Sequence, residues 1–205
     1  MRYLALHPGT VAALGAAHLA IVVAALAVAL AIALPLGVVA ARGGRGAGFL
    51  LGTLGAIYTI PSLALLALLV QAFGLGVAPL FVALIAYAQF MLVRNIVAGL
   101  RGVAPAVLDA GRGMGMTPRE LLVRVEFPLA LPAIVGGIRI AAVAMVALAT
   151  LGGYVGAGGL GKLIFDGLAL QHDDEIVAGS LAVCVLAIAI EVALRSLERR
   201  LRANE

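Results

Sequence analysis

Long runs of apolar residues recur along the chain and are separated by short polar segments. A helix that crosses the hydrocarbon of a bilayer needs roughly 20 apolar residues. Transmembrane β-strands are much shorter and alternate in polarity, so the pattern excludes a barrel. The sequence therefore predicts an all-α, polytopic bundle of about five membrane spans in one domain, residues 1–205. The runs that are long enough are 18–41, 49–73, 77–97, 129–151 and 176–197.

The composition supports a membrane protein, with 64% hydrophobic and 12% charged residues and a mean hydropathy of +1.18. A soluble domain usually has about a quarter of its residues charged. The first uncharged run, 3–41, is longer than the apolar part of a signal peptide, and two arginines follow it as they follow a membrane anchor. Pro8, Gly9 and His18 predict that residues 8–17 form a separate short surface helix before the first span.

Basic residues are distributed unevenly between the two sides of such a bundle. With five spans, eleven of the fourteen Lys and Arg residues fall on one side. Arginine-rich loops stay in the cytoplasm, so we expect the N-terminus outside the cell (inner or plasma) membrane and the C-terminus in the cytoplasm. This spread over three segments also argues against nucleic acid as a partner, despite a pI of 9.8. The eleven are Arg42, Arg45, Arg94, Arg101, Arg112, Arg119, Arg124, Arg195, Arg199, Arg200 and Arg202.

The cytoplasmic loop 98–128 carries signals for two short helices. Pro105 is expected to start the first, which reaches Met114, and Gly115 to follow it in a left-handed turn. A polar loop of this kind is either a solvated connection or a docking surface. Two capped helices favour docking, because the first has one face of small and apolar residues. That face comprises Val107, Ala110, Gly111 and Met114.

The second helix of the loop begins with a capping box, Thr117-Pro118-Arg119-Glu120, which has proline at the first helical position. Glu120 and Arg124 are spaced to pair along this helix. We predict that the helix runs to about Phe127, where Pro128 ends it.

The loop resembles one found in the membrane-spanning permeases of type I ABC importers, which has the form E-A-A-x3-G-x9-I-x-L-P. In this chain 109–111 match E-A-A, Gly115 matches the glycine and 125–128 match I-x-L-P; Gly111 in place of the second alanine is the one non-conservative departure. The resemblance implies the type I permease fold and a loop whose helices dock on the ATPase subunit. The residues it assigns to ATPase coupling are Asp109, Ala110, Gly111, Gly115, Met116, Thr117, Pro118 and Pro128.

Four further segments are similar to the osmoprotectant branch of this family. The resemblance implies inward transport of glycine betaine, choline, carnitine or a related compound by alternating access; the alternatives are a permease for an amino acid or a sulfonate and, less favoured, a secondary transporter. The implied partners are a cytoplasmic ATPase dimer, a second permease, either a copy or a homologue, and a separate extracytoplasmic solute-binding protein, within membrane lipid. The segments are 59–69, 110–118, 128–141 and 156–165.

Pro61 and Ser62 interrupt the second span, as broken helices do where transporters place their pathways. A packing kink explains the interruption equally well. Tyr58 and Tyr87 offer ring faces to a quaternary ammonium ion, although tyrosines near span ends also serve as interfacial anchors. These four residues are the candidates for a substrate pathway, with Gln89 and Asn95 as further polar groups. Arg139, deep in the fourth span, needs a partner or a water-filled cavity.

The remaining motifs do not indicate other chemistry. Residues 156–162 fit the first part of a nucleotide-binding loop, but Leu163 replaces the Ser or Thr that holds magnesium. We expect a glycine turn after the fourth span instead, followed by a short helix that packs Leu160 and Leu163 against the bundle. One cysteine and three dispersed histidines argue against a metal site. We expect no cofactor, and no catalytic residue because a separate subunit hydrolyses ATP. A secondary transporter would need carboxylates within its spans, and an intramembrane hydrolase a nucleophile with a base.

Overall fold

The computed structural model describes residues 2–202, and all regular structure in that range is helical. The all-α prediction is therefore confirmed. Four helices are long and apolar enough to cross a membrane, and the bent pair α3–α4 makes a fifth if it counts as one span. The α-helices are α1 (Arg2–Leu6), α2 (Pro8–Ala41), α3 (Arg45–Thr59), α4 (Ser62–Phe73), α5 (Val77–Arg101), α6 (Pro105–Gly113), α7 (Pro118–Leu121), α8 (Phe127–Ala149), α9 (Gly161–Leu170) and α10 (Asp173–Arg202).

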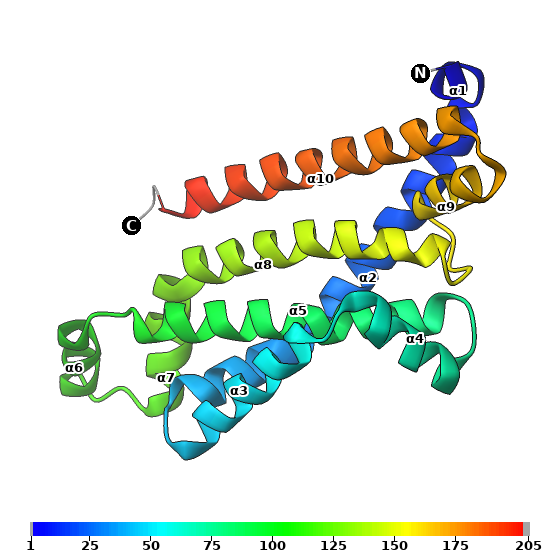
Figure 1. Ribbon diagram of the computed structural model, residues 1–205. Helices are drawn as coiled ribbons and strands as arrows, with labels where there is room; N and C mark the ends of the chain where they lie inside the picture. The colour runs from blue at the N-terminus through cyan, green and yellow to red at the C-terminus, as the bar shows by residue number, and fades with distance from the viewer. Residues whose placement is uncertain (1, 203–205) are drawn as a thin grey trace.

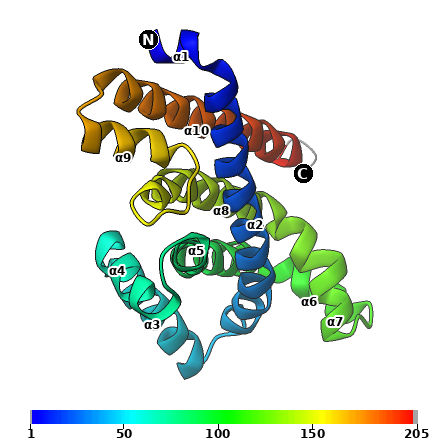
Figure 2. The same ribbon diagram turned by 90° about the vertical axis from the view of Figure 1, so that its right-hand side faces the viewer.

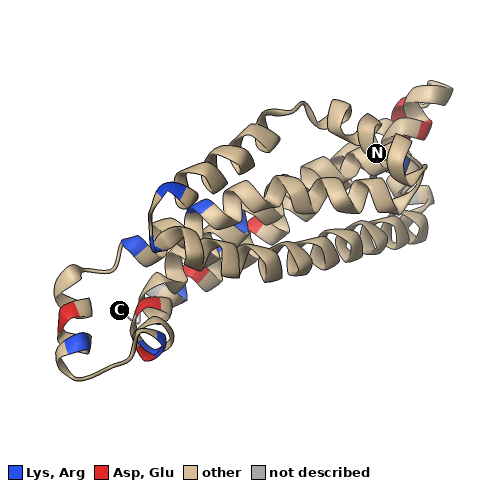
Figure 3. Ribbon diagram, turned by 90° about the horizontal axis from the view of Figure 1, so that it is seen from below, with Lys and Arg blue, Asp and Glu red and all other residues tan. Residues whose placement is uncertain are grey.

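The ends of the bundle differ in charge. Figure 1 places α6, α7, the α2–α3 connection and the C-terminus at one end, and α1, α9 and the α4–α5 connection at the other. Figure 3 shows most of the basic ribbon at the end that holds α6 and the C-terminus. The arginine-rich segments predicted to share one side therefore lie together. We call this the arginine-rich end.

Helix α2 is continuous from Pro8 to Ala41, so the prediction of a separate surface helix over 8–17 is wrong. Pro8 stands in the first turn, where its missing N–H leaves no bond unmade. His18 does not mark a membrane surface, because it is 1% exposed and its Nε2 lies 3.0 Å from the carbonyl oxygen of Val146 on α8. The short separate helix is α1.

Helix α5 is at the centre of the bundle, between α2 and α8, and α2 crosses its neighbours obliquely (Figures 1 and 2). Leu84, Leu92 and Ile96 of α5 are almost completely buried. A Cβ at Gly37 of α2 would lie 2.5 Å from the Ile96 side chain. Glycine at this position therefore allows the two helices to approach closely.

Helices α7 and α8 form one continuous helical segment, so the prediction that Pro128 ends a helix is wrong. The two are joined by a π-helical turn, Leu122–Glu126, and the whole segment Pro118–Gly153 comprises 36 residues. The N–H of Phe127 bonds to the carbonyl of Leu122, five residues back. Proline in a regular helix lacks one such bond and clashes with the preceding turn. The widened turn before Pro128 accommodates it near the start of α8.

Arg139 finds its partners on α10. Its guanidinium lies 2.5 Å from a carboxylate oxygen of Glu191 and 3.0 Å from one of Glu198. The spacing of Glu191 and Arg195 suits an ion pair within α10, but their closest atoms are 4.0 Å apart. The principal ion pairs thus join α8 to α10.

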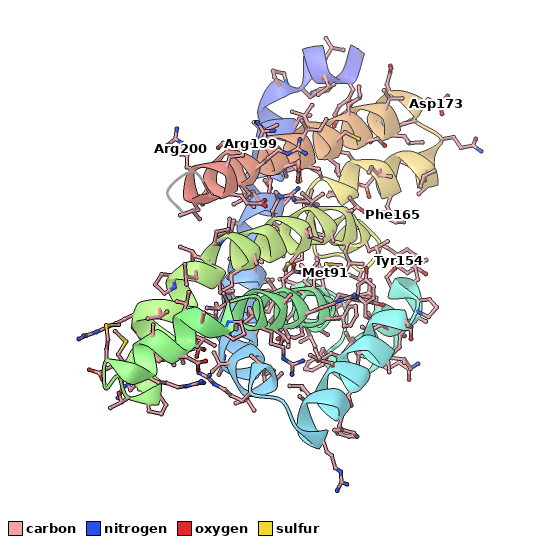
Figure 4. All side chains as sticks on the ribbon, turned by 90° about the vertical axis from the view of Figure 1, so that its left-hand side faces the viewer. Met91, Tyr154, Phe165, Asp173, Arg199 and Arg200 are labelled. Atoms are coloured by element: carbon pink, nitrogen blue, oxygen red, sulfur yellow. The ribbon has the colours of Figure 1, made fainter. Side chains whose placement is uncertain are left out.

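Glycines allow the chain to turn back after α8. A Cβ on Gly153 would lie 2.3 Å from the backbone of Gly161, and one on Gly161 would lie 1.9 Å from the carbonyl oxygen of Thr150. After this turn, Leu160 at the N-cap of α9 and Leu163 within α9 are both buried, as the sequence predicts. Tyr154 and Phe165 meet at this end, with ring centroids 5.7 Å apart (Figure 4).

Candidate transport cavity and coupling surface

The break between α3 and α4 shapes the candidate cavity. The two helices meet at an angle of 94°. Ile60, the residue before Pro61, has an extended backbone with ψ 129°, because proline disfavours the helical conformation of its predecessor. The hydroxyl of Tyr87 on α5 donates a hydrogen bond to the carbonyl of Ile60. The Ile60 carbonyl at the break therefore accepts a hydrogen bond from the neighbouring helix α5.

Three aromatic rings stand in contact beside this break. Tyr58 meets Tyr87 edge-on with centroids 5.9 Å apart and stacks on Phe90 at 5.2 Å. The guanidinium of Arg94 lies over the Phe90 ring, 5.8 Å from its centroid. The rings hold one another in position through these contacts, so the Tyr58 ring is fixed at the edge of the cavity.

A cavity of about 390 Å³ opens between the break, α5 and α8. Ligand sites of small molecules begin at roughly this volume. All four predicted pathway residues line it, and none of its lining residues is Asp, Glu, His, Lys or Arg. Met91, which Figure 4 labels on α5, contributes a flexible, polarisable wall. The lining residues are Tyr58, Thr59, Ile60, Pro61, Ser62, Tyr87, Ala88, Met91, Ala141, Ala144, Met145 and Leu148.

The other two polar groups singled out by the sequence do not reach this cavity. The Gln89 side chain is buried and donates to the carbonyl of Ala29 on α2. Asn95 donates to the carbonyl of Met91 within its own helix. Both residues therefore serve helix packing.

The coupling surface is the α6–α7 corner, which projects from the arginine-rich end (Figure 1). Helix α6 ends in a Schellman motif, in which the N–H of Met116 bonds to the carbonyl of Gly111 and that of Gly115 to the carbonyl of Arg112. Gly115 has φ +79°, which confirms the predicted left-handed turn. Thr117 and Glu120 form both bonds of the predicted capping box, which occupies the Glu120 carboxylate.

Close packing inside the corner explains the glycine at position 111. A Cβ there would lie 2.5 Å from the Leu121 side chain, so a larger residue would separate the two helices. Val107 and Met114, on the same face of α6, are 41% and 71% exposed. Asp109 pairs with Arg112 at 2.8 Å on the exposed side. The corner is rigid within itself and presents apolar side chains outward.

An ion pair fixes the base of this corner. The carboxylate of Glu126, in the π-helical turn, is buried and lies 2.9 Å from the guanidinium of Arg42. Arg101 donates to the carbonyls of Ala40 and Ala41. Glu126 was not among the residues predicted from the sequence. The available signal was that Glu126 is a lone carboxylate at the x position of the I-x-L-P match.

The structure gathers the predicted coupling residues 109–118 into this one corner and places Pro128 apart, at the start of α8. The predicted pathway residues form a second group at the cavity. The long segment 118–153 connects the two groups, since Ala141, Ala144 and Met145 of α8 line the cavity.

A bundle of apolar spans with a projecting, internally rigid corner and a cavity at a broken helix defines a membrane transport subunit. Residues 33–203 match the family described as the binding-protein-dependent transport system inner membrane component. The chain belongs to this family.

Curated relatives align over most of the chain. It is 43% identical to the carnitine transport permease protein OpuCB of Listeria monocytogenes, over 90% of this chain and 84% of the relative. It is 37% identical to the osmoprotectant import permease protein OsmW of Salmonella typhimurium, over 97% and 94%. Among solved structures, a chain of the inward-facing MetNI methionine ABC transporter superposes with a TM-score of 0.81 at 23% identity, covering 93% of this chain and 95% of that one. That likeness supports the type I ABC importer permease fold.

Proposed function

We propose that this chain is the membrane-spanning subunit of an ABC importer that moves a quaternary ammonium osmoprotectant into the cytoplasm. The observation that carries the proposal is the cavity in which Tyr58 and Tyr87 present aromatic rings and none of the lining residues is a carboxylate. Ring faces attract a quaternary ammonium ion without binding it as tightly as a carboxylate would, which suits a site that must also release it. The named activities of the curated relatives support the same substrate class.

In this proposal the α6–α7 corner receives the ATPase. Val107 and Met114 supply exposed apolar contacts, and Gly115 keeps the turn tight. A separate pair of cytoplasmic subunits hydrolyses ATP, and a second permease, identical or homologous, completes the membrane unit. The arginine-rich end then faces the cytoplasm. An extracytoplasmic binding protein delivers substrate to the opposite end, near α9.

Uptake by the reconstituted complex tests the substrate class. With its ATPase and binding protein in liposomes, the permease should accumulate glycine betaine, choline or carnitine only when ATP is supplied. Tyr58→Leu should reduce this uptake severalfold while Tyr58→Phe retains it, because only the ring face is required. Phe49→Leu, which removes an exposed ring on α3 outside the cavity, is the matched control. Uptake of methionine or taurine without any quaternary ammonium compound would overturn the proposal.

A further inference from the structure

One face of α10 is both apolar and exposed along its membrane-spanning part. Val185, Ile188 and Val192 are 64%, 63% and 60% exposed. At 100° per residue they lie within one narrow arc of the helix, beside the face that carries Glu191 and Glu198 toward α8. We call these three residues the apolar stripe.

The same arc continues into two arginines. Arg195 follows Val192 by three residues, and Arg199 follows Arg195 by four, which keeps both on the side of the stripe. From Val185 to Arg195 the helix rises about 15 Å, which is about half of a bilayer's hydrocarbon thickness. The stripe and its arginines therefore match the depth of one leaflet. Figure 4 shows Arg199 at the end of α10 opposite Asp173.

A polar cleft of about 310 Å³ lies beside these arginines, lined by Arg139, Arg195, Glu198 and Arg199. Arg139 occupies carboxylate oxygens of both Glu191 and Glu198. The Arg195 side chain is 58% exposed. Its Nε lies 4.0 Å from the nearest carboxylate oxygen of Glu191, which is a long distance for an ion pair. Within residues 2–202, Arg199 forms no ion pair. Among the described residues, the cleft thus offers at least one guanidinium, that of Arg199, without a bound counter-charge.

We infer that the stripe and the cleft together bind one anionic phospholipid of the leaflet at the arginine-rich end. Its phosphate lies between Arg195 and Arg199, and an acyl chain lies along Val185, Ile188 and Val192. Basic pockets between membrane helices are suited to anionic headgroups. Free phosphate would use the arginines without the stripe, and a second copy of the chain would cover the stripe without needing the charge.

The absence of tryptophan from this chain provides a direct test. Val192→Trp places a single fluorophore on the stripe of the full chain, which is reconstituted in vesicles of brominated phosphatidylglycerol mixed with phosphatidylcholine. A second preparation carries the bromine on phosphatidylcholine instead. The ratio of the two quenching efficiencies measures which lipid occupies the stripe. We expect a clear preference for phosphatidylglycerol, and Arg199→Gln should reduce it about fivefold, the change that corresponds to one basic side chain at an anionic surface.

Arg200→Gln is the matched control, because it removes the same charge one position further on, about 100° around the helix. The preference should survive this change and should also survive added inorganic phosphate at constant ionic strength. Competition by phosphate would mean that the arginines take free anions, and an equal effect of Arg199→Gln and Arg200→Gln would mean diffuse surface charge. A tryptophan quenched by neither lipid would mean that protein covers the stripe. Each of these three results overturns the inference.

Discussion

The hydroxyl of Tyr87 donates a hydrogen bond to the carbonyl of Ile60, at the point where α3 and α4 meet at 94°. Proline at position 61 breaks the helix, and a tyrosine 27 residues away in sequence stabilises the break. The same tyrosine lines the cavity. The shape of the cavity therefore depends on a hydrogen bond between two of its own lining residues, Tyr87 and Ile60.

Tyr87→Phe should lower the free energy of unfolding by about 0.5–1.5 kcal/mol, because it removes the part-buried hydrogen bond to the Ile60 carbonyl. Thermal unfolding of the purified permease measures this, and uptake should fall in parallel as the break loosens. Tyr58→Phe is the control, since within the described residues the Tyr58 hydroxyl forms no hydrogen bond. Equal melting temperatures for the two variants would contradict the role given to the Tyr87 hydroxyl.

Gly115→Ala should cost roughly 1 kcal/mol or more, because φ is +79° at this residue. Gly113→Ala should be neutral or slightly stabilising, since Gly113 is helical and its added Cβ likewise meets nothing within 4 Å. Comparison of the two by thermal unfolding isolates the backbone effect. A stable Gly115→Ala protein would show that the turn relaxes easily.

Gly115→Arg tests coupling as well as the turn. The position is open in the isolated chain, so a bulky charged side chain should mainly disturb whatever docks there. We expect normal membrane insertion, weaker co-purification of the ATPase and loss of uptake. Asp109→Ala should be milder, because Asp109 makes one exposed ion pair. Wild-type uptake with the ATPase retained in Gly115→Arg would exclude the corner as the coupling element.

Arg42→Gln should destabilise the base of the corner by about 1.5–3 kcal/mol, the range for hydrogen bonds to charged groups, because it leaves the buried Glu126 carboxylate without its cation. The half-exposed Arg42 side chain keeps the loss below that of a fully buried pair. A double-mutant cycle with Glu126→Gln, measured by thermal unfolding, gives the coupling energy. Additive effects would show that the two side chains do not interact.

Thiol labelling tests the orientation proposed from the arginine distribution. In a chain whose only native cysteine is replaced by Cys184→Ser, Arg119→Cys should be shielded from an impermeant reagent in intact cells. Asp173→Cys, at the opposite end of the bundle, should react (Figure 4). Labelling of Arg119→Cys from outside would reverse the topology and remove the proposed ATPase site from the cytoplasm.

The sequence predicted the features that depend on local chemistry. The capping box at Thr117 and the left-handed turn at Gly115 are such features, since each depends on residues a few positions apart. The break at Pro61 was visible for the same reason. It also explains how four sequence-predicted pathway residues come to line one cavity, although their role in transport remains a proposal.

Features that depend on distant partners could not be predicted. Nothing near Glu126 in sequence points to Arg42, and the spacing of Glu191 and Arg195 suggested a pair within α10 although Arg139 lies closer to Glu191. Pro128 was expected to end a helix because its local preference is clear, whereas the π-helical turn that accommodates it spreads the distortion over several residues.

The helical segment from Pro118 to Gly153 turns sharply between α7 and α8 (Figures 1 and 2), so it joins the corner to the cavity as a bent arm. Its far end is held by the backbone contact of Gly153 with Gly161 and by the His18–Val146 bond. Its near end begins with α7 in the coupling corner. With the far end held, a push on the corner reaches Ala141 and Ala144 in the cavity wall only through the π-helical turn Leu122–Glu126 and the bend beside it. The stiffness of this turn therefore sets how much of the corner's motion arrives at the cavity.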